Sequence, residues 1–346
     1  MLPPRLVRRL AVHPLLLGGG AAMVVLSPIL GVLAAAASPF LGNWRPLRLL
    51  WVSMSYLVWD ILSTLGFAGL WVGSGFGAKV QSPPIQRAHY AILRWFMSGL
   101  CNSGLRAVRS WIEVTDFAGA EAALSDHRQP VLVFSRHAAV GDSFMLVHVL
   151  MTRYGRRPRS VMKALLQWDP FFDLFGNRLP NCFVAGAGQE LIDGIRRLAD
   201  GLRRDEALLI FPEGANFTEA RRQRTIKRLE AGGHFDAAER ARALENLMAP
   251  RPGGALAALD GAPEADVIFV AHTGLPDPRS SIDLLRLVPL DHAVQIGLWR
   301  EPAAEIPSDR EDRIDWLFAW WCRLDAFVTE RGGERTSVAA PAVSPS

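Results

Sequence analysis

The stretch PVLVFSRHAAVGDSFMLVHVL, residues 130–150, joins a short apolar run to a turn and then to an apolar helical pattern. The run at 130–134 lies between turn and polar residues, and such a run is typical of a buried strand. The same succession recurs along the chain, with apolar runs at 160–162, 182–185, 207–211 and 267–271 and helical patterns at 143–154, 190–202 and 218–249. This alternation predicts an α/β fold with a mainly parallel mixed sheet flanked by helices.

The first 80 residues are too apolar for a soluble surface. No charged residue occurs from 14 to 44, and Asp60 is the only one from 49 to 78. A bilayer is spanned by about 20 apolar residues, and a second apolar run directly after the first is not expected of a cleaved signal peptide. Residues 1–80 are therefore predicted to be a membrane-anchoring region of two hydrophobic segments. Pro28 and Pro39 leave open whether the first segment spans the membrane or re-enters it.

The charges suggest how the chain meets the membrane. Basic residues precede the first apolar run and follow the second, but Arg45 and Arg48 lie between the two runs, so the charge signal is mixed. The excess at the N-terminus and after the second run favours a cytoplasmic position for both ends and for the globular domain. An integral protein of the inner or plasma membrane is therefore predicted. Asp60 is expected to face the other segment or to lie near the interface. The net charge of +4 fits work against an anionic membrane surface, and no nucleic-acid-binding motif appears.

The rest of the chain divides into three predicted parts. Residues 85–300 form the globular domain, 301–332 an amphipathic helix, and 333–346 a disordered tail rich in small residues and proline. Trp316, Trp320 and Phe327 fall along one side of the helix, which either packs on the domain or lies in the membrane interface. The three cysteines are widely spaced and fit neither a disulfide framework nor a zinc site.

His137 and Asp142 stand in the turn between the first quoted strand and its helix. A turn that contains Gly141 can fold Asp142 back to the imidazole, where a carboxylate fixes the tautomer and raises the basicity of the other ring nitrogen. The same spacing recurs at His272 and Asp277 in HTGLPD. Because a proline and an irregular loop follow there, that second pair is predicted to have a structural role in a turn and no role in catalysis.

A second motif, FPEGANF at residues 211–217, follows the strand at 207–211. Carboxyl ends of parallel strands meet at one edge of a sheet, so Glu213 and Gly214 are expected near His137. Glycine permits a positive φ or the close approach of a ligand. On its own the motif also fits an ordinary turn that ends a strand.

In this order the two motifs resemble those of the glycerolipid acyltransferases, the family of lysophosphatidic acid and lysophospholipid acyltransferases. His-x4-Asp at 137–142 and Phe-Pro-Glu-Gly at 211–214 match the family's hallmarks. Lys163 in VMKALLQWDPFFDLFG resembles a stretch that the family carries between them. MAPRPGG, with Arg251, resembles the Pro-Arg-x-x-Gly element of the family's eukaryotic-type branch. The resemblance covers roughly residues 90 to 280.

The resemblance implies that residues 85–300 are an acyltransferase domain with His137 and Asp142 as the catalytic pair. It implies a substrate-binding set whose members are Arg136, Lys163, Glu213, Gly214 and Arg251. It further implies a fatty acyl transfer from acyl-CoA or acyl carrier protein, as co-substrate, to the hydroxyl of a lysophospholipid such as lysophosphatidic acid. Neither a metal nor another cofactor is implied. The expected partners are a membrane lipid acceptor and an acyl thioester donor.

Four positions depart from the family's pattern and bear on the acceptor's head group. Arg136 stands before the histidine in place of asparagine or a small residue, and Ala139 replaces a common serine. Ala215 and Asn216 follow the Glu-Gly pair in place of Thr-Arg or Thr-Asp. The basic stretches 156–160 and 221–228 are predicted either to be exposed to solvent or to bind phosphates or anionic lipid.

Two other functions stay open. One is a lipid esterase that uses Ser143 in the Gly-Asp-Ser of the quoted stretch, although no histidine stands three residues after an aspartate, as such an enzyme requires. The other is a non-catalytic lipid-binding membrane protein that has kept the fold.

Overall fold

The computed structural model describes residues 2–139, 141–186, 188–275 and 281–338. The chain divides into two compact units, each built from separate stretches of sequence. Unit 1 contains Met1–Trp111, Phe144–Leu198 and Pro278–His292, and unit 2 contains Ile112–Ser143, Ala199–Asp277 and Ala293–Ser346. The predicted domain at 85–300 therefore contributes to both units.

The sheet of unit 2 has its strands in the order β1 (Trp111–Asp116), β7 (Ala293–Glu301), β6 (Asp266–Thr273), β2 (Val131–Ser135) and β5 (Glu206–Ile210). β2 is parallel to both β5 and β6, whereas β7 is antiparallel to β6. In unit 1, β3 (Arg157–Lys163) runs parallel to β4 (Cys182–Val184). Every residue of β2 and β5 is buried, as expected of strands covered on both faces. The predicted α/β class, with a mostly parallel mixed sheet flanked by helices, is confirmed.

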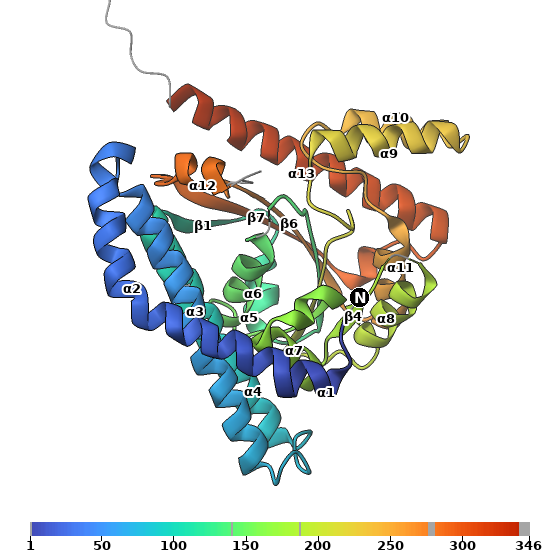
Figure 1. Ribbon diagram of the computed structural model, residues 1–346. Helices are drawn as coiled ribbons and strands as arrows, with labels where there is room; N and C mark the ends of the chain where they lie inside the picture. The colour runs from blue at the N-terminus through green and yellow to red at the C-terminus, as the bar shows by residue number, and fades with distance from the viewer. Residues whose placement is uncertain (1, 140, 187, 276–280, 339–346) are drawn as a thin grey trace, which may run out of the picture. The chain divides into compact units, whose positions relative to one another are not determined.

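The helices of unit 2 are α5 (Ala120–Asp126), α9 (Glu219–Ala231), α10 (Phe235–Ala243), α11 (Pro252–Gly261) and α13 (Arg310–Val338), with a short 3-10 helix at Ala303–Glu305. α9 and α10 lie side by side as a helical hairpin (Figure 1). The single helical pattern predicted at 218–249 is thus divided, because Gly233 takes a φ of +75° that ends α9 and turns the chain.

α13 packs on β6 through a buried apolar side. Its fully or nearly buried residues include Leu317, Trp320, Trp321, Leu324 and Phe327. The Trp320 ring stacks on that of Phe269 in β6, with 4.3 Å between centroids. Of the two alternatives for the amphipathic helix, the structure therefore has the packed one. The helix continues through Val338, into the stretch predicted to be a disordered tail. Residues 339–346 lie outside the described part of the chain.

Unit 1 begins with two long apolar helices, α2 (His13–Leu41) and α3 (Arg45–Gly73), after α1 (Arg5–Val7) and a π-helical turn at Arg8–Val12. The helical stretches Arg5–Leu41 and Arg45–Gly73 are long and apolar enough to cross a membrane. Pro28 and Pro39 lie inside α2 without ending it, although the helix is visibly bent in Figure 1. The other helices of this unit are α4 (Pro83–Val108), α6 (Asp142–Thr152, which starts in unit 2), a 3-10 helix (Ala164–Trp168), α7 (Pro170–Arg178), α8 (Gln189–Ala199) and α12 (Ser281–Leu287).

Asp60, in the middle of α3, is buried and accepts a hydrogen bond of 3.3 Å from the backbone N–H of Phe171. It therefore faces the first turn of α7, and a position near the membrane interface stays a prediction. The N-terminus of a helix offers unpaired N–H groups to a carboxylate, which explains why this position is tolerated in an apolar helix.

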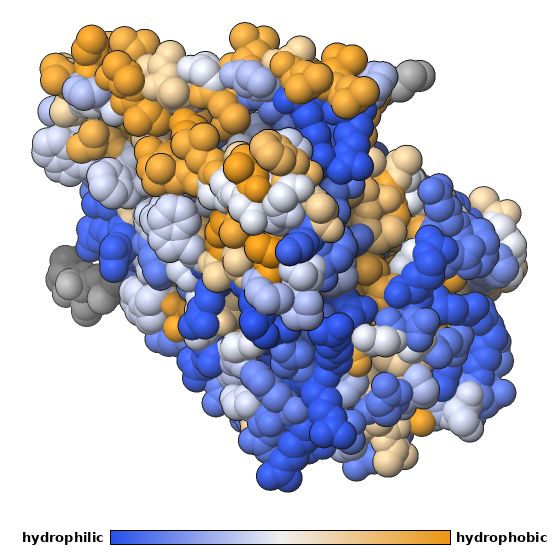
Figure 2. All heavy atoms as spheres, turned by 90° about the horizontal axis from the view of Figure 1, so that it is seen from below, coloured by the Kyte–Doolittle hydropathy of each residue, from blue (hydrophilic) through white to orange (hydrophobic). Residues whose placement is uncertain are grey.

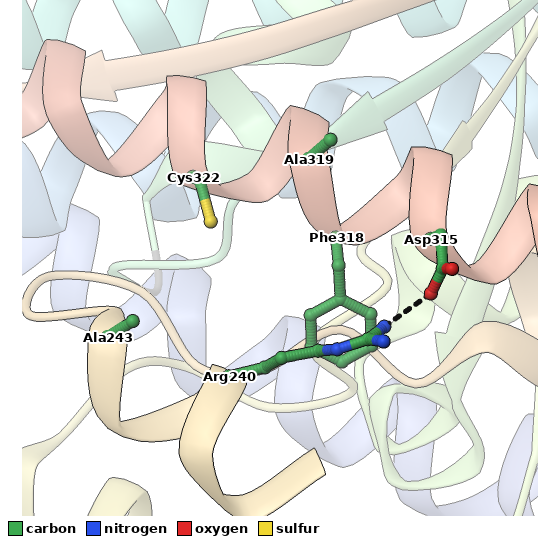
Figure 3. Close-up of a pocket in the computed structure, with 6 residues that line it drawn as sticks. All are labelled: Arg240, Ala243, Asp315, Phe318, Ala319 and Cys322. Atoms are coloured by element: carbon green, nitrogen blue, oxygen red, sulfur yellow. Dashed lines mark hydrogen bonds and ion pairs between the residues drawn. The ribbon is translucent and has the colours of Figure 1, made fainter. Parts of the chain in front are cut away.

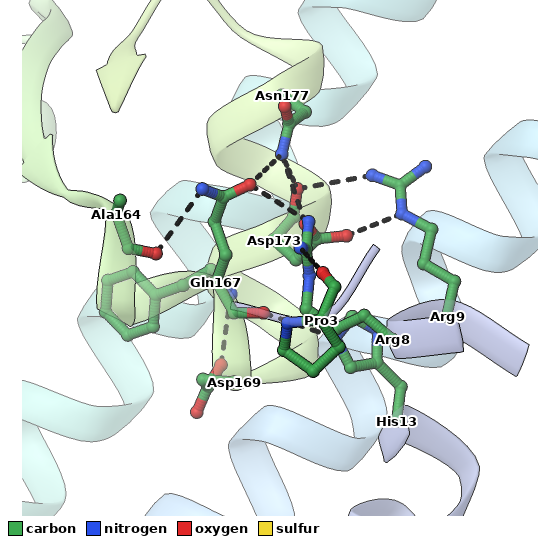
Figure 4. Close-up of polar contacts among 10 residues, drawn as sticks. Pro3, Arg8, Arg9, His13, Ala164, Gln167, Asp169, Asp173 and Asn177 are labelled. Atoms are coloured by element: carbon green, nitrogen blue, oxygen red, sulfur yellow. Dashed lines mark hydrogen bonds and ion pairs between the residues drawn. The ribbon is translucent and has the colours of Figure 1, made fainter. Parts of the chain in front are cut away.

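The start of the chain is tied to the same helix by ion pairs (Figure 4). Arg8 Nη2 and Arg9 Nε each lie 2.5 Å from a carboxylate oxygen of Asp173, whose side chain is fully buried. Arg8 also donates to Gln167 at 3.0 Å. α7 thus contacts both apolar helices, since it also packs on α3.

Candidate active site

The predicted pair is formed in unit 2 at the end of β2. His137 Nδ1 lies 3.0 Å from both carboxylate oxygens of Asp142, which is the first residue of α6. The turn folds back because the carboxylate also accepts the backbone N–H groups of Ala138, at 2.8 Å, and Ala139, at 3.1 Å. A carboxylate at the N-terminus of a helix that accepts several N–H groups is held in one orientation.

Asp142 stays ionised in this environment. Complete burial alone would raise the pKa of its carboxyl, but the imidazoles of His137 and His272 hold that pKa well below its usual range. An ionised carboxylate accepts hydrogen bonds only, so His137 Nδ1 carries the proton. The lone pair is then on Nε2, the nitrogen that can act as a base. The His137 ring stacks on Phe211 with 4.4 Å between centroids and keeps 17% of its side chain exposed.

Glu213 supports His137 from the interior. One carboxylate oxygen accepts the backbone N–H of His137 at 3.0 Å, and the other accepts that of Met248 at 3.2 Å. Burial raises the pKa of Glu213 to about 8, against the opposing effect of Arg136 and the two N–H groups. The FPEG motif is therefore joined directly to the His-x4-Asp motif, as their common sheet edge predicts.

Arg136 is also buried, with 6% exposed. Its guanidinium donates to the carbonyl oxygens of His272, at 2.7 Å, and Asn246, at 3.1 Å. Burial lowers its pKa, and the charges of Glu213 and Asp142 oppose this effect. Arg136 and Glu213 thus occupy supporting positions bonded to protein groups, and their expected contact with substrate stays a prediction.

Gly214 and Arg251 form the exposed part of the site. Gly214 has a φ of +70°, and a Cβ added to it would lie 3.3 Å from Arg251 Nη1. The backbone N–H of Arg251 donates to the Pro212 carbonyl at 2.8 Å, which fixes its position. The Arg251 side chain is exposed.

Two further residues that the sequence singled out are Lys163, which lies in unit 1, and Ser143, which contacts Asp142. Lys163, the last residue of β3, is exposed and belongs to unit 1, so its contact with substrate stays a prediction. Ser143 donates its hydroxyl to Asp142 at 3.4 Å, and within the described residues no hydrogen bond joins it to His137. A serine nucleophile needs that bond, so the geometry does not favour the esterase alternative.

His272 was not among the predicted site residues. It lies inside β6, is completely buried, and places Nε2 at 3.6 Å from a carboxylate oxygen of Asp142. The interpretation of HTGLPD as a structural turn is therefore wrong for His272, because the strand extends through Thr273. Asp277 lies outside the described residues. The available signal was the repeated His-x4-Asp spacing itself.

A separate groove of about 260 Å³ lies between α10 and α13 (Figure 3). Its lining residues are Arg240, Ala243, Asp315, Phe318, Ala319 and Cys322. It contains no residue of the predicted site. Across the residues that the structure describes, no group of three or more His, Cys, Asp or Glu side chains could hold a metal ion.

Fold and site together define an α/β domain with a His–Asp pair at the carboxyl edge of its sheet. Residues 115–260 match the family model described as Acyltransferase. This part of the chain, which contains the His-x4-Asp and FPEG motifs, is therefore similar to an acyltransferase domain. A search of curated proteins found none that matches the chain.

Proposed function

We propose that this protein is a membrane-bound acyltransferase that moves a fatty acyl group from acyl-CoA or acyl carrier protein to the hydroxyl of a lysophospholipid. Lysophosphatidic acid is the proposed model acceptor. The observation that carries the proposal is the hydrogen bond between His137 Nδ1 and an ionised Asp142 within the matched domain.

His137 acts as the general base of the proposed reaction. Its Nε2 removes the proton of the lipid hydroxyl while the hydroxyl oxygen attacks the thioester carbonyl. The tetrahedral intermediate then collapses, the carbon–sulfur bond breaks, and the imidazolium returns its proton to the thiolate. Asp142 keeps the imidazole in the required tautomer and stabilises the imidazolium. A base of this kind contributes a rate factor of about 10²–10⁴.

Arg251 is proposed to bind a phosphate of the acceptor or of the donor. The support is its exposed guanidinium beside the positive-φ glycine, a position where backbone and side chain can both approach an anion. Lys163 is a second candidate for this contact. We propose neither a metal nor another cofactor for the reaction.

The two apolar helices α2 and α3, which together form the apolar hairpin, are proposed to hold the chain on one leaflet of the inner or plasma membrane. The catalytic domain is proposed to be cytoplasmic. Both ends of α3 are bonded to unit 1: Arg48 donates to the Ala107 carbonyl at 2.7 Å, and Arg178 to the Phe67 carbonyl at 2.6 Å. Because the same compact unit holds α3 at both ends, we favour a helix that lies in the plane of the membrane over one that crosses it. Exposed apolar residues along α2, with Leu15, Val25, Val32 and Phe40 among them, are proposed to face lipid. Hydrophobic side chains gather along one edge of the surface drawn in Figure 2.

Membranes of an expressing host, supplied with labelled acyl-CoA and a panel of lysolipids, test the proposal. Wild type should acylate at least one lysolipid, and His137→Ala should lose at least about 10²-fold of that rate. His234→Ala, an exposed histidine at the α9–α10 turn, is the matched control and should retain full activity. Equal rates for wild type and His137→Ala would refute the mechanism.

The same assay separates the two alternatives. An esterase would release free fatty acid and lose activity in Ser143→Ala. A non-catalytic lipid-binding protein would bind lysolipid without any release of thiol from acyl-CoA.

A further inference from the structure

His272 is held rigidly against the active-site carboxylate. In the β6–β7 ladder it pairs with Ile296, and its carbonyl oxygen accepts the Arg136 guanidinium at 2.7 Å. Backbone and side chain both lie in the interior, so the imidazole has little freedom to turn away. His272 lies outside residues 115–260 and is thus beyond the family match.

Neither ring nitrogen of His272 makes a hydrogen bond of normal length within the described residues, and the polar groups close enough to interact with the ring are the Asp142 carboxylate and the backbone of Arg136. A completely buried N–H without an acceptor is costly, and the Asp142 carboxylate offers an acceptor, with Oδ2 at 3.6 Å from Nε2. That separation is a few tenths of an ångström longer than a hydrogen bond. Catalytic hydrogen bonds are often long in a site without substrate and shorten when it is filled.

We propose that His272 is a positioning residue that donates Nε2–H to Asp142 and holds its carboxylate toward His137. The inference rests on the proposed function and extends it to a His137–Asp142–His272 chain. Within these three linked side chains, His272 stays neutral throughout the reaction, and only His137 exchanges a proton with substrate.

The charges around His272 fit a neutral donor. Burial lowers its pKa, the nearby Arg136 guanidinium lowers it further, and Asp142 opposes both. The groups that face it are Arg136 after β2 and Asp142 at the start of α6; Glu213 after β5 and Asp325 on α13 face Arg136 in turn. A neutral N–H on Asp142 draws off part of the carboxylate's negative charge. Without the His272 N–H, Asp142 would stabilise the His137 imidazolium more strongly. The neutral imidazole that acts as the base would then be present only at higher pH.

Steady-state kinetics with acyl-CoA and the preferred lysolipid test this role. His272→Leu removes the donor and should lower kcat about 10-fold or more with little change in KM, since a hydrogen bond to a charged group is lost. The acidic limb of its pH–rate profile should move to higher pH. His272→Gln, whose amide nitrogen replaces Nε2, should restore most of kcat and the profile. His148→Leu, a buried histidine on α6, is the control for loss of a core imidazole and should keep the wild-type profile.

The outcomes separate this inference from the proposed function. If His137→Ala is inactive while His272→Leu keeps the wild-type kcat and pH profile, the positioning role is wrong and the general-base mechanism stands. If His137→Ala is as active as wild type, the proposed function itself fails. Should His272→Leu not fold, His272→Asn takes its place, because its shorter amide does not reach Asp142; a wild-type profile in that variant also overturns the inference.

Discussion

At the residue scale, the site depends on ionisable groups that the fold has removed from water. Glu213 is the clearest example, because its carboxylate is fully buried and bonded only to protein N–H groups. Its pKa is raised from 4.5 to about 8, so the folded chain retains a proton that the unfolded chain releases at lower pH. Between these two values, a rise in pH favours the unfolded state and the contribution of Glu213 to stability falls.

Glu213→Gln removes this titration and keeps an acceptor for the His137 N–H. We expect the free energy of unfolding of wild type to fall by roughly 2 kcal/mol or more, relative to the variant, between about pH 5 and pH 8. Thermal or denaturant unfolding in detergent at several pH values measures the difference. Parallel pH profiles for the two proteins would show that Glu213 does not titrate in this range.

Asp142→Asn tests the other buried carboxyl. Asparagine presents an N–H to His137 Nδ1 in place of an acceptor, which favours the wrong tautomer, so activity should fall about 10³-fold or more with the fold retained. The comparison of kcat and of the thermal unfolding temperature with wild type checks both statements. A variant with near wild-type kcat would show that Asp142 is not the partner of the base.

Sequence predicted His137, Asp142 and Glu213 as one cluster because motif and strand order place them at the same edge. It could not predict that Glu213 reaches His137 through a backbone N–H, since no spacing encodes a side chain's direction. His272 was missed for a related reason. Its strand continues two residues past the apolar run at 267–271, and burial in β6 depends on the pairing with β7, a strand that the sequence analysis did not identify.

At the element scale, α13 holds a loop that serves the site. Asp325 accepts the backbone N–H groups of Glu245, at 3.1 Å, Asn246, at 2.7 Å, and Leu247, at 2.9 Å. The next residue, Met248, donates to Glu213. The amphipathic pattern predicted the helix, but the polar contact that gives it a role in the site depends on tertiary packing. β1 and β7 were missed because polar and charged residues interrupt their apolar ones.

Asp325→Ala should therefore lower the free energy of unfolding by about 2–4 kcal/mol, because three N–H groups of the loop lose their acceptor. Activity should fall as well, since the support of Glu213 is loosened. Asp315→Ala on the same helix is the matched control, because Asp315 pairs with Arg240 at an exposed position, where an ion pair contributes about 0–1 kcal/mol. Equal stability losses in the two variants would contradict a supporting role for Asp325.

At the scale of the whole molecule, composition predicted an apolar N-terminal region but not its relation to the rest of the chain. The structure groups residues 1–111 with two distant stretches in unit 1, so the two apolar helices belong to a compact unit together with those stretches. No local pattern reveals this, because the deciding contacts are single polar side chains, such as Asp60 and Asp173, that bind partners more than 100 residues away.

The position of the α2–α3 turn distinguishes an in-plane hairpin from two crossings. Arg45, just after this turn, donates to the Val288 carbonyl at 2.9 Å, which keeps the turn with unit 1. In a chain without its native cysteines, Asn43→Cys should react with a membrane-impermeant maleimide only in inside-out vesicles, as should His234→Cys in unit 2. Two crossings place residue 43 on the other side, where it would react in intact cells or right-side-out vesicles and His234→Cys would not. That second pattern would overturn the one-leaflet hairpin while leaving the proposed chemistry of unit 2 unchanged.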